Sequence, residues 1–265
     1  MPKKKRITTK IPIEPSHLNK YSPGSLQLPD AEDIWSDSKN NWKASFLIWK
    51  NHGYTNDGNL IVGYIDLEQE RSSEDQSKIS FYEKRIHQGG RENIIEGFVI
   101  SDASLFHLPL EWELTSKFIT AEGKVVPELN YHQKAVVESE KIVRITNKKR
   151  FVEEKPEQLI HEFGLIRYLF EPDFSIKNLG SFTFLENGLI PKAGHIISEA
   201  PELYHSYENR QLKCYVQFGY GINPIEYYLD DNNLLCAAIS SFSAKICNQH
   251  AAEYYNEFVS GRFNN

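Results

Sequence analysis

The sequence predicts an α+β fold, in which a large curved, mainly antiparallel β-sheet (a half-barrel-like meander) packs against two or three helices. Short runs of alternating hydrophobic residues follow one another from residue 60 to residue 146, with turns rather than helices between them. Two other stretches, 30–51 and 156–171, repeat hydrophobic residues at the spacing of a helix. The chain has 265 residues, 40% of them hydrophobic, so it is long enough for a full core without disulfides or metals.

Residues 1–29 are expected to form an extended, basic, proline-containing N-terminal arm, and residues 30–265 a single domain. The first ten residues include five basic and no acidic ones, and four prolines between positions 12 and 29 break any helix. The opening Pro2–Arg6 resembles a short nuclear import signal, although a plain basic tail is the simpler interpretation. No hydrophobic stretch follows that would complete a secretory signal.

The first predicted helix covers residues 30–51, and Gly53 suits its C-terminal end. Trp35, Trp42 and Trp49 are seven residues apart. Two turns of helix return the chain to nearly the same face, so the three indoles would form one stripe. We interpret the stripe as core that packs on the sheet, and a ring-lined ligand pocket is the alternative.

Strands and two further helices follow. The predicted strands cover residues 60–67, 79–86, 94–100, 112–118, 136–137, 142–145, 182–185, 189–190, 215–218, 225–229 and 234–246. The helix over 156–171 lies between two prolines, and a final helix is expected over 250–259. Asn187-Gly188 is the strongest short hairpin signal in the chain.

The charge distribution argues against nucleic acid as a partner. The formal net charge is −6, and without the first ten residues the chain carries 25 basic and 36 acidic residues, a net charge of −11. A body this acidic is repelled by a phosphate backbone. The one internal basic run, residues 141–150, is flanked by four glutamates and is interpreted as a solvated strand-and-turn face.

The cysteines indicate a reducing compartment. Cys214, Cys236 and Cys247 are odd in number and no two have metal-binding spacing. Without an export signal, reduced thiols in the cytoplasm are the simplest interpretation. No run of roughly 18 apolar residues occurs, so we expect no membrane span.

Sequence motifs for nucleotide, metal or nucleophile chemistry are missing, so we expect no metal and no cofactor. His161 with Glu162, on the second predicted helix, is the best candidate for a catalytic base. Adjacent helical residues point about 100° apart, so these two side chains would not orient each other.

Aromatic residues are the more informative candidates for a site. Seven of them fall between residues 204 and 228, where tyrosine suits the mouth of a half-open sheet or a protein interface, and ordinary strand packing is the alternative. The predicted ligand-binding residues are Trp42, Trp112, Tyr215, Phe218 and Tyr228.

A resemblance concerns the last fifth of the chain. Asn223-Pro224-Ile225-Glu226-Tyr227-Tyr228-Leu229-Asp230, followed by Leu234-Leu235, resembles the last hairpin of periplasmic antiparallel half-barrels of the lipoprotein-carrier type and their uncharacterised relatives. The resemblance implies a curved sheet closed around helices. Those carriers have an export signal, which is not recognisable here.

Together these observations favour a non-catalytic binding protein. Its partner would be an apolar small molecule in the concavity of the sheet, or a protein on the tyrosine-rich rim. A metal-independent hydrolase that uses a histidine base, and a structural or scaffold protein, are the alternatives.

Overall fold

The computed structural model of the chain describes residues 41–50, 60–87, 89–104, 106–170, 179–186, 190–207 and 210–263. Four features singled out in the sequence lie outside these residues: the arm 1–29, Trp35, Gly53 and the Asn187-Gly188 turn.

The described chain consists mainly of β-strands. They are β1 (Trp42–Lys50), β2 (Leu60–Arg71), β3 (Gln76–Ile86), β4 (Glu92–Asp102), β5 (Pro109–Ile119), β6 (Tyr131–Glu138), β7 (Lys141–Thr146), β8 (Lys149–Glu154), β9 (Leu159–His161), β10 (Phe182–Leu185), β11 (Pro191–Glu199), β12 (His205–Tyr207), β13 (Arg210–Phe218), β14 (Ile225–Leu229), β15 (Leu235–Ile239) and β16 (Ser243–Cys247). Two α-helices, α3 (Glu162–Leu169) and α5 (Ala251–Phe263), and two 3₁₀ turns, η1 (Pro127–Leu129) and η3 (Pro201–Leu203), complete the described elements.

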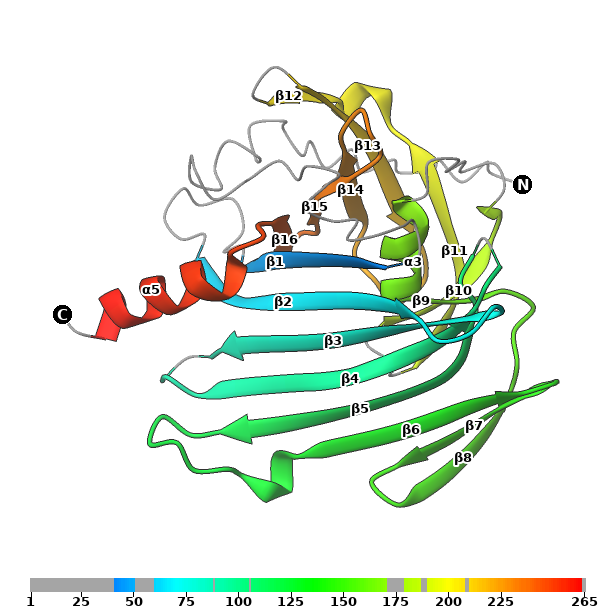
Figure 1. Cartoon of the computed structure of the whole chain (residues 1–265), viewed down its shortest axis with the longest axis horizontal. Coiled ribbons are helices and arrows are strands. Elements are labelled where there is room, and N and C mark those ends of the chain that lie inside the picture. Colours follow the sequence, from blue (N-terminus) through cyan, green and yellow to red (C-terminus); the bar gives the residue numbers. More distant parts are fainter. Residues whose placement is uncertain are drawn as a thin grey trace, which may run out of the picture.

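One barrel-like sheet contains all the described strands, in the order β8-β7-β6-β5-β4-β3-β2-β1-β16-β15-β14-β13-β11-β10-β9, with β12 beside β13. Neighbouring strands are antiparallel except β9 and β10. Strands β1 to β8 form a continuous meander, and β1 joins it to the second half of the chain by pairing with β16. The sheet curls strongly, so its two halves face each other across α3 (Figure 1).

The predicted α+β class was wrong, because the described fold is a barrel-like β-sheet and not a sheet with a layer of helices packed on it. Helix α3 has only eight residues and lies inside the curve of the sheet, whereas α5 lies outside against β1 and β2 (Figure 1). The antiparallel sheet itself is confirmed. Neither described helix combines the length and the apolar character needed to cross a membrane.

The helix predicted over 30–51 was also wrong where the structure describes it, because residues 42–50 form strand β1. Trp42 packs on the concave side of the sheet and Trp49 on the convex side. Seven is an odd number, so the spacing that places two indoles on one helical face places them on opposite faces of a strand. From Phe46 to Trp49 the strand is buried on both sides, so this half lacks the polar alternation that would have identified a strand.

The helix predicted over 156–171 is much shorter in the structure. Residues 159–161 form β9, and α3 begins only at Glu162. Phe163, Ile166 and Phe170 keep the predicted helical spacing and are all buried. The helix expected over 250–259 corresponds to α5, in which Tyr255 is buried against the sheet.

Two hydrophobic cores lie on the two faces of the sheet. The larger core fills the concave side, where α3 packs against Trp42, Trp112 and the inward residues of β1 to β5. In β3, for example, Ile79 and Phe81 face inward and Phe81 contacts Phe163 of α3, with ring centroids 4.6 Å apart. The smaller core lies on the convex side beneath α5. The concave side is therefore filled by the protein's own helix.

Candidate functional site

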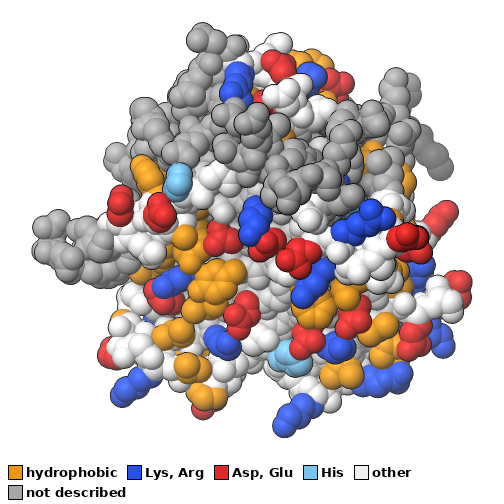
Figure 2. All heavy atoms as spheres, in the orientation of Figure 1, with side chains coloured by type: hydrophobic (Ala, Val, Ile, Leu, Met, Phe, Trp, Pro, Cys, Tyr) orange, Lys and Arg blue, Asp and Glu red, His pale blue; other side chains and the backbone are white. Residues whose placement is uncertain are grey.

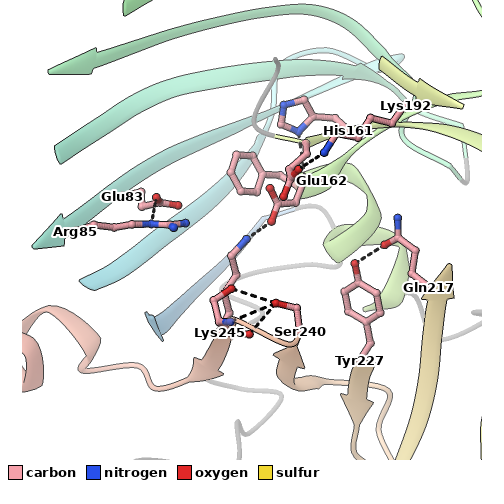
Figure 3. A network of polar contacts seen from close by, with 12 residues as sticks. Glu83, Arg85, His161, Glu162, Lys192, Gln217, Tyr227, Ser240 and Lys245 are labelled. Atoms are coloured by element: carbon pink, nitrogen blue, oxygen red, sulfur yellow. Dashed lines mark hydrogen bonds and ion pairs between the residues drawn. The ribbon is translucent and has the colours of Figure 1, made fainter. Parts of the chain in front are cut away.

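A group of charged residues lies at the N-terminal end of α3, on the concave side of the sheet (Figure 3). Glu162, the first residue of the helix, forms an ion pair with Lys245 of β16. The two side chains are only 12% and 16% exposed. The carboxylate also suits the positive end of the helix dipole. This ion pair fixes the start of α3 against the centre of the sheet.

Strand register places a second pair on the same face of the sheet as the first. Arg85, Gly63, Ile48 and Lys245 are successive partners across β3, β2, β1 and β16, so all four face the concave side. Three strand spacings put the two cationic residues about 15 Å apart along the sheet. A Cβ at Gly63 would lie 2.1 Å from the Lys84 carbonyl oxygen, so glycine is required for this close approach to β3.

Glu83 and Arg85 of β3 form the second pair, with 2.5 Å between Oε1 and Nε. The third is Glu186 with Lys192 at the start of β11, 2.6 Å apart. Burial works against the charged form of Arg85, but Glu83, Glu162 and Glu186 together raise the pKa of its guanidinium. We call these six residues (Glu83, Arg85, Glu162, Glu186, Lys192 and Lys245) the charge cluster. It contains three carboxylates and three cations, so it is neutral as a whole.

The carboxyl of Glu162 is ionised in this setting. Burial alone would raise its pKa, but the neighbouring Lys245 ammonium outweighs burial and lowers it. Oxygen Oε1 accepts from Lys245, whereas Oε2 is buried without a hydrogen-bond donor among the described residues. A buried carboxylate oxygen with no donor is rare in folded proteins and calls for an explanation.

His161 precedes this carboxylate and caps the helix. Its Nδ1 accepts a hydrogen bond from the Phe163 N–H, 3.2 Å away, and its side chain is fully buried. Burial lowers its pKa to about 4, so the imidazole is neutral at pH 7. Because Nδ1 accepts, the proton lies on Nε2.

A separate chain of hydrogen bonds lies in the second half of the sheet. The Tyr227 hydroxyl donates to Oε1 of Gln217 at 2.7 Å, and the Gln217 amide lies 3.0 Å from Nδ1 of His195. All three side chains are buried. Burial, with added contributions from Glu162 and Glu186, raises the pKa of Tyr227, so the phenol stays protonated beside the cluster.

The structure does not bring all five predicted ligand-binding residues together. Trp42, Trp112 and Tyr215 belong to the concave core, where the first two are 0% and 1% exposed. Tyr228 belongs to the convex core and donates to Glu226. Phe218 is 45% exposed on the outer surface. The catalytic pair predicted as an alternative, His161 and Glu162, does lie at the charge cluster.

Sequence reasoning missed Arg85, Glu83 and Lys245. A signal existed for the first two, since strand alternation from Ile79 and Phe81 puts residues 83 and 85 on the same buried face. No such signal identifies Lys245. Strand β16 alternates partly exposed Ser243 and Lys245 with buried Ala244 and Ile246, so Lys245 stands where a solvent-facing side chain is expected.

The described residues contain no group of three or more metal-ligating side chains. The cysteines Cys214, Cys236 and Cys247 are free and buried, and burial raises the pKa of the first two thiols. In Figure 2, acidic and basic side chains are interspersed over the visible face.

No family model matches the chain, and no curated protein matches it in sequence. Among solved structures, the chain is similar to a β-barrel-like protein of a domain of unknown function, DUF1849, from Brucella abortus. The two are 12% identical with a TM-score of 0.49, and the similarity covers 78% of this chain and 95% of that one.

Proposed function

We propose that the chain is a non-catalytic binding protein whose ligand is a small zwitterion held at the charge cluster. The observation that carries this proposal is the buried Oε2 of Glu162, an ionised oxygen without a donor next to Lys245 and within the electrostatic influence of Arg85. A ligand ammonium would supply the missing donor. A ligand carboxylate would then interact with the guanidinium of Arg85, whose side chain is 31% exposed.

The neutrality of the cluster decides the ligand's net charge. A charged group taken out of water is costly unless it is compensated. A purely anionic or cationic ligand would leave one uncompensated charge in a site where Glu162 and Lys245 are mostly buried. A zwitterion brings both charges and adds none overall.

The chemistry of the neighbouring groups supports binding rather than catalysis. His161, the expected base, is buried, neutral and occupied as a helix cap. Tyr227 is held in its protonated form. An apolar ligand in the concavity, which the lipoprotein-carrier resemblance would imply, competes with α3 and its aromatic contacts for the same space.

Calorimetric titration with leucine, N-acetylleucine and leucine methyl ester tests the proposal. The latter two each lack one of the two charges. Leucine should bind, and each derivative should bind at least about tenfold more weakly, equivalent to ~1.4 kcal/mol. Glu162→Gln should lose leucine binding, whereas Glu96→Gln, which removes a carboxylate from the exposed Lys117–Glu96 pair, should not. Equal binding by wild type and Glu162→Gln, or no heat with leucine, would contradict the proposal.

A protein partner on the rim of the sheet is a second candidate. Ile196 of β11 and Phe218 of β13 are direct strand partners, each 45% exposed, and Tyr220 is 80% exposed with its ring against Gly194. Contiguous exposed apolar side chains are typical of interaction sites. Phe218→Asp should reduce the fluorescence of a bound apolar dye, and Phe242→Asp, at another exposed ring, is the control.

A further inference from the structure

The last strand at one end of the sheet, β8, has an open side. Among the described strands β8 pairs with β7 only, and every residue of β8 except Glu153 is exposed. Phe151 and Val152, at its centre, are 42% and 46% exposed. A sheet edge of this kind presents unpaired N–H and C=O groups that another strand can complete.

The hairpin between β7 and β8 determines which residues carry those groups. Asn147 and Lys148 have φ of 45° and 70°, which suits a two-residue turn of type I′, and Thr146 and Lys149 are paired across it. The N–H of Lys155 donates to the Glu140 carbonyl at 2.9 Å. Odd-numbered residues of β8 therefore bond to β7. The N–H and C=O groups of Arg150, Val152 and Glu154 point away from it.

These three outward-bonding residues also share one face of the sheet. Alternate residues of a strand point to the same side, and Val152 lies opposite Val143, away from the buried face of Ile142. The order along this face is basic, apolar, acidic. Such an order is complementary to itself when a second copy runs antiparallel.

We propose that β8 pairs antiparallel with β8 of a second copy of this chain, about a two-fold axis at Val152. Val152 then faces its own copy, and Arg150 lies opposite Glu154 at both ends, so that each basic residue meets an acidic one. The pairing adds about six main-chain hydrogen bonds and joins the two sheets into one.

The neighbouring register, centred on Phe151, is less suitable. It would place Lys149 opposite Glu153, but Glu153 already forms an ion pair with Arg144 of β7. Phe151 also lies over the same guanidinium, with 5.3 Å from Cζ to the ring centroid. Arg150 and Glu154 form no ion pair with any described residue, so they are available to a second copy. In the Val152 register Lys149 lies opposite Lys155. This like-charged pair is at the solvent-exposed ends of the interface.

Sedimentation velocity of the full chain, from low micromolar to several hundred micromolar, tests the proposal. The wild type should form a concentration-dependent dimer of micromolar affinity, as expected for a small interface. Arg150→Glu and Glu154→Arg should each be monomeric, because they place like charges opposite each other. An equimolar mixture of these two variants should recover a dimer, as should the double variant R150E/E154R.

Backbone pairing is tested separately by Val152→Pro. The substitution removes one outward-pointing N–H without breaking a bond to β7, so it should abolish the dimer and leave the far-ultraviolet circular dichroism unchanged. Lys124→Glu, at an exposed turn position, is the control and should dimerise like the wild type. A wild type that stays monomeric throughout, or a dimer that survives both Arg150→Glu and Val152→Pro, would overturn the proposal. The outcome of these dimerisation experiments is independent of zwitterion binding, because β8 carries no residue of the charge cluster.

Discussion

The two ends of the strand order, β9 and β8, show opposite solutions to the exposed edge of a sheet. Strand β9 has three residues, all at most 3% exposed, and it leads directly into α3. Strand β8 has six residues and both of its faces are exposed. Short, covered edges resist pairing with other chains, whereas longer open ones permit it. We infer that the β9 end maintains the core and that the β8 end is available for assembly.

The same contrast extends to the charges. Glu162, which directly follows β9, is mostly buried with Lys245 of the central strand β16, and this pair holds α3 in place. At the β8 end, Arg150 and Glu154 lie on the surface. The same residue change should therefore alter the free energy of unfolding by different amounts at the two ends.

The largest effect is expected for Phe163→Ala, which removes a ring that is 1% exposed and contacts Phe81 and His161. The lost burial and the cavity left behind should lower the free energy of unfolding by about 4 kcal/mol. Chemical denaturation measures this change. A loss below ~1.5 kcal/mol would show that the interior around α3 is loosely packed, and the contrast between the two ends would fail.

Removing one partner of the inner ion pair should have the next largest effect. Lys245→Met leaves the Glu162 carboxylate mostly buried without its cation, at a cost of about 2–3 kcal/mol given its partial exposure. The double variant K245M/E162Q should recover part of the loss. Lys117→Met, from an ion pair with both side chains nearly half exposed, should cost at most ~0.5 kcal/mol and is the control.

A pH-dependent effect is expected at the β9 end. His161 has a pKa of about 4 in the folded protein and 6.5 in the unfolded chain. Between these values the unfolded chain binds a proton that the folded protein does not, so stability is lost as pH falls from 6.5 towards 4. His161→Asn keeps an oxygen that can cap α3 but cannot titrate.

The gap in unfolding free energy between wild type and His161→Asn should therefore change by about 2 kcal/mol from pH 7 to pH 5, in favour of the variant at pH 5. Denaturation at the two pH values gives this difference. His132→Asn, at an exposed position on β6, serves as the comparison variant. A gap that does not vary with pH would mean that His161 is protonated in the folded protein as readily as in the unfolded chain.

The smallest effect is expected for Phe151→Ala on β8. Its ring is 42% exposed and mainly covers the Arg144 guanidinium, so the stability loss should stay below ~1 kcal/mol. The comparison with Phe163→Ala uses the same residue change at the two ends of the sheet. A loss as large as that of Phe163→Ala would indicate that the β8 end is part of the cooperative core.

Much of the first half of the sheet could be predicted, because its strands are buried mainly on the concave side. In β3, for instance, Ile79 and Phe81 alternate with partly exposed residues, and the pattern identifies both the strand and its inward face. The same alternation is absent in the second half of β1, where residues 46–49 are buried on both faces. Hydrophobic spacing then fits a helix as readily as a strand, which explains the error at Trp42 and Trp49.

The charge cluster was harder to predict for a different reason. Its members come from β3, α3, β10–β11 and β16, so only the closure of the sheet brings them together. His161 and Glu162 were identified because they are adjacent, but their partner Lys245 is 83 positions further along the chain. The tyrosine-rich segment does not lie on a single face of the sheet. Its neighbours in sequence lie on opposite faces, with Tyr227 in the concave core and Tyr228 in the convex core.

The pairing of β1 with β16 has a consequence for how the chain acquires its structure. Phe46 is the partner of Cys247, so the central seam of the sheet joins segments from nearly opposite ends of the described chain. Contacts this distant in sequence carry a large loop-closure entropy and slow folding. During synthesis, β2 to β8 can pair as each strand emerges, but α3 cannot be enclosed until β16 has left the ribosome. We therefore expect a nascent chain with an exposed apolar concave face, dependent on the final fifth of the sequence for its completion.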